Sequence, residues 1–181
     1  MASTCSHLPP PVSHVFTAQG TSHINAPIDT VWDVLFDLEK YPEWNPFVRS
    51  LAFTEPSGRV LSREPAPGDR LVIRSNIPPN LSGNGQRQTT CTFFAFDKTN
   101  YKASWGQIDI PQFLLHTSRW SVLSETELVD GGKQTMYETQ EAFAGPLAWI
   151  IKWFVGANVQ KGFQAMADAL KHRVESLPNR E

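Results

Sequence analysis

Three side chains that can exchange protons, His116, Tyr137 and Glu141, occur in the segments LLHTSRWSVL and KQTMYETQEAFAG. Both segments are rich in β-branched and aromatic residues and predict strands, in which alternate side chains share one face. Trp120 shares the face of His116, and Phe143 shares that of Glu141. These aromatic rings indicate that both faces point into the protein. On neighbouring strands, an imidazole, a phenol and a carboxylate would converge in one apolar space.

Such a group supports general acid–base catalysis. An apolar surrounding raises the pKa of a carboxylate toward neutrality and makes it a usable base. The reaction class this predicts is proton abstraction beside a carbonyl, followed by aldol closure or loss of water. In this hypothesis Glu141 is the base, His116 the acid, and Tyr137 holds the substrate oxygen.

The same residues admit plainer roles. His116 can be a strand-end residue in water, Tyr137 can serve only to orient a ligand, and Glu141 can pair with Arg119 or Lys152. A one-residue bulge would also reverse the parity of either strand.

The chain lacks the short motifs of other site classes: it has no GxSxG, HExxH, CxxC or GxxxxGK[ST] sequence. Its five histidines show no metal-ligand spacing, so we expect neither a metal nor a cofactor. A net charge of −2, a pI near 6.2 and the lack of a basic stripe argue against a nucleic-acid partner. No signal peptide or membrane span is predicted, so a cytoplasmic location is expected.

The elements that must position these residues form one domain. We expect a flexible tail over residues 1–13, a single ligand-binding domain over residues 14–177, and a short tail over residues 178–181. One strand and one helix open the domain, six strand candidates separated by Gly, Pro and Asn turns follow, and a long apolar-striped helix closes it. This order predicts an antiparallel meander rather than β-α-β units.

The stretch YPEWNPF, residues 41–47, puts three aromatic rings and two prolines directly after the first helix. Pro42 and Pro46 exclude a continuous helix here and predict a rigid turn. We expect Tyr41, Trp44 and Phe47 to plug one side of the interior. The alternative is that these rings only fill the core, as buried aromatics commonly do.

Several motifs resemble one known family. INAPIDTVWDVLFDLEKYPEWNPFV, then GDRLVI, SRWSVL, FAGPL and GFQAMADALKHRVE are similar, in order, to the SRPBCC superfamily of START-like and birch-pollen-allergen-like proteins, in its polyketide cyclase/dehydrase and lipid-transport branch. The resemblance implies an α+β helix-grip fold. In that fold a curved antiparallel sheet of about seven strands wraps a long C-terminal helix, two short helices follow strand 1, and an internal apolar cavity remains.

The resemblance implies a hydrophobic, polyketide-like or aromatic small-molecule ligand. The leading hypothesis is a cofactor-free cyclase/dehydratase. The alternatives are a non-catalytic carrier of lipid or another apolar metabolite, and an interaction module that docks a partner or a membrane through exposed Trp149 or Trp153. The oligomeric state, monomer or homodimer, stays open. The residues expected to contact the ligand are Trp32, Tyr41, Trp44, Phe47, Phe94, Trp105, Ser118, Trp120, Thr139, Phe143, Ile151, Phe154, Val155 and Phe163.

Overall fold

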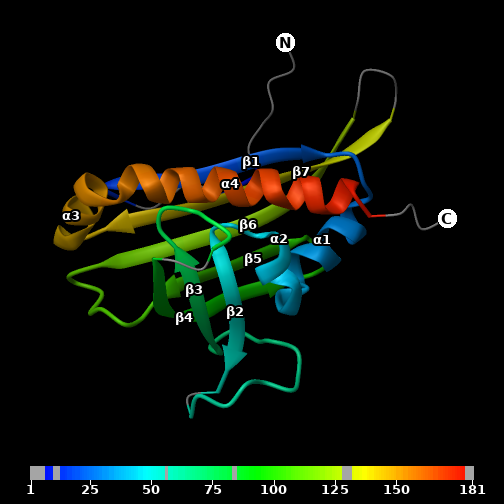
Figure 1. The fold of residues 1–181 in the computed structure, drawn as a ribbon. Coiled ribbons are helices and arrows are strands. Elements are labelled where there is room, and N and C mark those ends of the chain that lie inside the picture. Colours follow the sequence, from blue (N-terminus) through cyan, green and yellow to red (C-terminus); the bar gives the residue numbers. More distant parts are fainter. Residues whose placement is uncertain (1–6, 10–12, 56, 83–84, 128–131, 178–181) are drawn as a thin grey trace.

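A seven-stranded antiparallel sheet and a C-terminal helix that lies along it dominate the computed structural model, which describes residues 7–9, 13–55, 57–82, 85–127 and 132–177 (Figure 1). The elements are β1 (Phe16–Ile24), α1 (Ile28–Phe36), η1 (Leu38–Lys40), α2 (Tyr41–Trp44), β2 (Val48–Thr54), β3 (Arg70–Asn76), β4 (Gln86–Asp97), β5 (Lys102–Gln107), β6 (His116–Glu127), β7 (Lys133–Ala144), α3 (Pro146–Phe154) and α4 (Gly156–Glu175). The strand order is β1-β7-β6-β5-β4-β3-β2. The predicted α+β helix-grip architecture is confirmed.

The β6–β7 ladder is the part of the sheet that positions the candidate site. It pairs without interruption from His116 opposite Ala144 to Glu127 opposite Lys133. Residues directly opposite in an antiparallel pair project on the same face. Arg119, which faces Glu141 in this register, therefore shares a face with that carboxylate.

The C-terminal helix is not the single continuous helix predicted for its sequence. Val155, with φ −132° and ψ −7°, leaves the helical region and separates α3 from α4. The apolar stripe of α4 is buried as expected, and Phe163 at its centre is fully enclosed. Gly162 allows the Phe47 ring to pack closely against α4, because a Cβ at position 162 would lie 2.4 Å from that ring.

The turn after α1 is rigid for reasons of hydrogen bonding as well as proline content. The Asn45 side-chain oxygen accepts the backbone N–H groups of Phe47 and Val48, at 3.0 and 2.9 Å. The Arg49 guanidinium donates to the carbonyl oxygens of Asn45 and Pro42. The three rings of this turn are therefore held in fixed, buried positions.

Strand β4 has a β-bulge, and one predicted ligand contact beside it lies on the outer face. The register against β5 shifts between Phe93 and Ala95. Phe93 then points inward and is 1% exposed, whereas Phe94 lies on the outer face, 43% exposed, against Gly106. The prediction that Phe94 contacts an internal ligand is wrong, because side chains alternate along a strand and its neighbour Phe93 faces inward.

Candidate functional site

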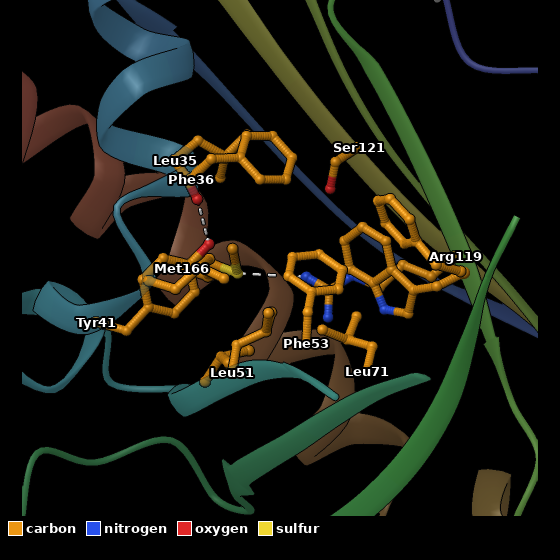
Figure 2. Close-up of a pocket in the computed structure, with 13 residues that line it drawn as sticks. Leu35, Phe36, Tyr41, Leu51, Phe53, Leu71, Arg119, Ser121 and Met166 are labelled. Carbon is orange, nitrogen blue, oxygen red and sulfur yellow. Dashed lines mark hydrogen bonds between the residues drawn. The ribbon is translucent and has the colours of Figure 1, made fainter. Parts of the chain in front are cut away.

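The inner face of the sheet, α4 and the turn after α1 enclose a small apolar space (Figure 2). Its lining is Leu35, Phe36, Leu38, Tyr41, Val48, Leu51, Phe53, Leu71, Phe93, Trp105, Arg119, Ser121 and Met166. Its volume of about 10 Å³ accommodates one water molecule. The spacious cavity expected from the resemblance is thus closed here, because side chains from β2, β4 and η1 fill it.

Arg119 is the one charged side chain in this lining. It is 4% exposed, and its guanidinium carbon lies 4.4 Å from the Phe163 ring centroid and 5.2 Å from that of Trp105. One terminal nitrogen, Nη2, donates to the sulfur of Met166 at 3.3 Å, the contact drawn in Figure 2. The Nε atom has no hydrogen-bond partner among the described residues.

No carboxylate of the described residues forms an ion pair with Arg119 within 4.0 Å. An arginine side chain stays protonated in proteins. A buried charge without a close partner is energetically costly. Arg119 is therefore the feature of the interior that most clearly requires a functional explanation.

Glu141 stands opposite Arg119 on β7 and faces the same interior. Burial raises the pKa of the Glu141 carboxyl, while the Arg119 charge and a hydrogen bond from the Thr117 hydroxyl lower it. The net direction is upward. By the strand register Glu141 lies on the inner face, as predicted, but its side chain is half-buried, and neither Glu141 nor Tyr137 is among the residues that line the enclosed space.

Two phenols are also buried in the interior. Tyr137 is fully buried on the inner face of β7, and its hydroxyl has no hydrogen-bond partner among the described residues. The Tyr41 hydroxyl donates to the Leu35 carbonyl at 2.6 Å, shown in Figure 2. Burial, reinforced by the nearby Tyr137, raises the pKa of Tyr41 far above its ordinary value. Tyr41 therefore remains a neutral hydrogen-bond donor.

The predicted direction of β6 is wrong. The side chains that enter the interior are those of Arg119 and Ser121, so His116, Ser118 and Trp120 lie on the outer face. His116 accordingly does not join Glu141 and Tyr137. Proton donation by His116 and ligand contact by Ser118 and Trp120 are not supported.

The cause is that the outer face of the sheet is also covered. Val122, on the same face as Trp120, is 1% exposed and lies opposite Glu138. The His7 backbone N–H donates to the Glu138 carboxylate at 3.0 Å, so His7 lies over this part of the sheet. A buried aliphatic residue on β6 consequently does not mark the inner face.

The remaining predicted contacts divide into four groups. Tyr41 and Trp105 line the space. Residues that are buried but do not line it are Trp32, Phe47, Thr139, Phe143 and Phe163. Trp44 instead borders a separate polar surface hollow between α1 and the end of α4.

The α3 residues do not line the space either. Ile151 and Val155 are half-buried, and Phe154 is 79% exposed. The prediction for Phe154 is wrong because the break at Val155 turns α3 away from the line of α4.

Sequence reasoning considered Arg119 only as a partner of Glu141 and missed its position in the lining. The sequence offered one signal, because a partner of an inward-facing Glu141 on the neighbouring strand must itself face inward. The half-buried aliphatic and aromatic lining from β2 and η1, such as Phe53 and Leu38, carries no comparable signal.

A family model described as polyketide cyclase/dehydrase and lipid transport matches residues 15–175. The chain belongs to this family. It is also 25% identical to oxopyrrolidines biosynthesis cluster protein O of Penicillium oxalicum, over 92% of this chain and 90% of that protein.

Solved structures with low sequence identity share the fold. The ZhuI aromatase/cyclase of Streptomyces sp. R1128 matches with a TM-score of 0.60 and 15% identity, over 88% of this chain and 93% of that chain. A START superfamily protein of Mycobacterium smegmatis matches with a TM-score of 0.54 and 15% identity, over 92% and 100%. At these identities the likeness extends to the fold alone.

Proposed function

We propose that this protein binds a hydrophobic polyketide-like or aromatic ketone inside the grip and catalyses its cyclisation and dehydration. The observation that carries the proposal is the buried guanidinium of Arg119, which forms no ion pair within 4.0 Å in the described part of the chain and shares the inner face with Glu141 on the neighbouring strand. The relative from a biosynthesis cluster and the aromatase/cyclase of the same fold are consistent with this chemistry.

The two groups have complementary roles in an aldol closure. The Glu141 carboxylate takes a proton from the carbon beside a ketone, and the C–H electron pair moves onto the ketone oxygen to give an enolate. Arg119 donates N–H groups to that oxygen, where the negative charge develops. Hydrogen bonds aimed at developing charge are strongest where water is excluded, as at this buried site.

Closure and water loss follow from the same groups. The enolate carbon attacks a second ketone of the chain, and protonated Glu141 gives its proton to the alkoxide that forms, which leaves a hydroxyl group. The Glu141 carboxylate then removes the second proton from the attacking carbon, and the new enolate expels the hydroxyl group as a C=C bond forms. Glu141 returns that proton to the departing hydroxide to give water, and the carboxylate is regenerated. The Tyr137 hydroxyl, which has no partner among the described residues, is available to hydrogen-bond a substrate oxygen. The apolar walls hold the chain in the bent shape that closure needs.

Ligand entry requires side chains to move, because the enclosed space holds about one water molecule. The lining residues that are only half-buried are Phe36, Leu38, Leu51 and Phe53. We therefore place the entrance between η1 and β2, where displacement of these side chains opens the interior.

An aryl 1,3-diketone such as benzoylacetone tests the site before the natural substrate is identified. Binding beside Arg119 should lower the apparent pKa of the diketone, which is visible in its enolate absorbance. Arg119→Met should abolish that shift. Glu141→Gln should slow carbon-bound proton exchange on a less acidic aryl ketone by about 10²–10⁴ while affinity stays within a few-fold.

Glu138→Gln is the matched control, because Glu138 lies on the same strand but on the opposite, outer face. It should leave both readouts unchanged. The alternative function, a non-catalytic carrier, is favoured by the predominantly apolar lining. Diketone binding with no pKa shift, and proton exchange unaffected by Glu141→Gln, would support the carrier and refute the catalytic proposal.

A further inference from the structure

The large apolar side chains of helix α3 face solvent rather than the protein core. Trp149, Ile150, Trp153 and Phe154 are 48%, 52%, 75% and 79% exposed, whereas Ala148 is fully buried. At 100° per residue these four positions form one contiguous face opposite Ala148. We call this face the α3 patch. Figure 1 shows α3 at one end of the sheet, away from α1 and α2.

The area of the α3 patch is at the upper end of the range found for monomers. Aromatic side chains of this kind present about 150–250 Å² each, so the exposed fractions sum to roughly 600 Å². The largest apolar patch on an ordinary monomer is about 300–600 Å² and often functional. The neighbouring turn adds Phe113, 77% exposed, next to Leu114, whose carbonyl accepts the backbone N–H of Leu147 at the start of α3.

The charged residues of α3 and of the first half of α4 have one sign. Between Glu141 and Asp168 the charged residues are Lys152 and Lys161, with no carboxylate. The Lys152 ammonium lies 5.2 Å from the Trp149 ring centroid, at the border of the patch. In the adjacent connection, the carboxylate of Asp109 accepts the backbone N–H of Thr90.

We propose that the α3 patch docks on the surface of an anionic lipid bilayer. Tryptophan and phenylalanine side chains beside lysine are the composition of interfacial helices, in which the rings enter the headgroup region and the ammonium groups reach lipid phosphates. The nine residues of α3 are too few to cross a bilayer, and no helix of the described residues is long and apolar enough to do so. The helix therefore lies in the plane of the surface.

A second copy of the chain is a poorer occupant of the patch. A two-fold contact through α3 would bring the two Lys152 side chains together with no carboxylate from α3 or the first half of α4 to pair with them. Protein interfaces also surround their apolar centre with a polar rim. The proposal is independent of the proposed catalytic function. Docking on a bilayer would bring the protein to the lipid phase, in which an apolar ligand accumulates.

Vesicle flotation tests the proposal with phosphatidylcholine vesicles, with and without about one-third phosphatidylserine. The intact protein should float with the anionic vesicles, less so at high salt because screening weakens the lysine contribution. Trp153→Ser combined with Phe154→Ser should lower the bound fraction at least ten-fold. Lys152→Glu should lower binding to anionic vesicles several-fold and leave any binding to neutral vesicles unchanged.

The control is Val60→Ser combined with Leu81→Ser, two exposed aliphatic residues outside the patch. It should bind like the unaltered protein, and unchanged thermal unfolding of each variant should exclude misfolding. No binding of the unaltered protein to anionic vesicles would overturn the proposal. So would concentration-dependent self-association that the Trp153→Ser, Phe154→Ser variant abolishes, because the patch would then be a dimer interface.

Discussion

Replacement of Arg119 by methionine should stabilise the folded protein and remove its response to enolate-forming ligands. The substitution keeps an unbranched side chain of similar length beside Met166 and Phe163 and deletes the buried charge. Methionine adapts to irregular apolar spaces. The pKa of Glu141 should rise further, because the Arg119 charge now lowers it.

The expected size follows from the surroundings of the guanidinium. Burying an ion costs several kcal/mol after relaxation. Two cation–π contacts, to Phe163 and Trp105, return about 0.5–2 kcal/mol each. The sulfur contact of Met166 adds little, and the guanidinium Nε has no hydrogen bond to lose among the described residues. We expect a net gain of about 1–3 kcal/mol in the free energy of unfolding.

Urea denaturation measures this gain. With a slope of about 1–3 kcal/mol per molar urea, the unfolding midpoint should rise by about 1 M. Arg49→Met is the matched control, since the Arg49 guanidinium bonds two backbone carbonyls at 2.6 Å and its loss should destabilise the protein. If Arg119→Met instead lowered stability by about 1 kcal/mol or more, Arg119 would be a structural residue, and the inference that it awaits a ligand oxygen would fail.

Three further predictions concern the interior. Phe163→Ala should cost about 3–5 kcal/mol, because the ring is fully buried; an unchanged urea midpoint would contradict the packing of α4. Burial raises the pKa of Glu141 above 4.5, so its contribution to stability is full below that pH and is lost as the pH rises through the folded pKa. Glu141→Gln should therefore match the unaltered protein near pH 4 and exceed its urea midpoint increasingly toward pH 8; a less stable variant at pH 8 would refute this. Burial strongly raises the pKa of the Cys91 thiol, so in a Cys5→Ser background iodoacetamide should react only after unfolding, and fast labelling of the native protein would disprove it.

Local sequence patterns were sufficient to predict the element order, the antiparallel meander and the rigid turn after the first helix. Proline fixes backbone angles wherever it occurs, and glycine-containing turns end strands irrespective of distant contacts. The inward direction of Tyr137 and Glu141 was predictable for a similar reason, since Phe143 on the same regular strand is buried. These features depend on near neighbours in the chain.

Only the tertiary structure decided which residues accompany Glu141. Parity on β6 pointed to His116, but the packing of His7 over Glu138 buries the outer face as well, so burial on that strand does not identify its inner side. The bulge beside Phe93, the break at Val155 and the closing of the interior likewise result from contacts between distant segments. Alternation along a strand defines two faces but does not say which of them points inward. The segments that pack on each face decide this, and they placed Arg119 rather than His116 beside the Glu141 carboxylate.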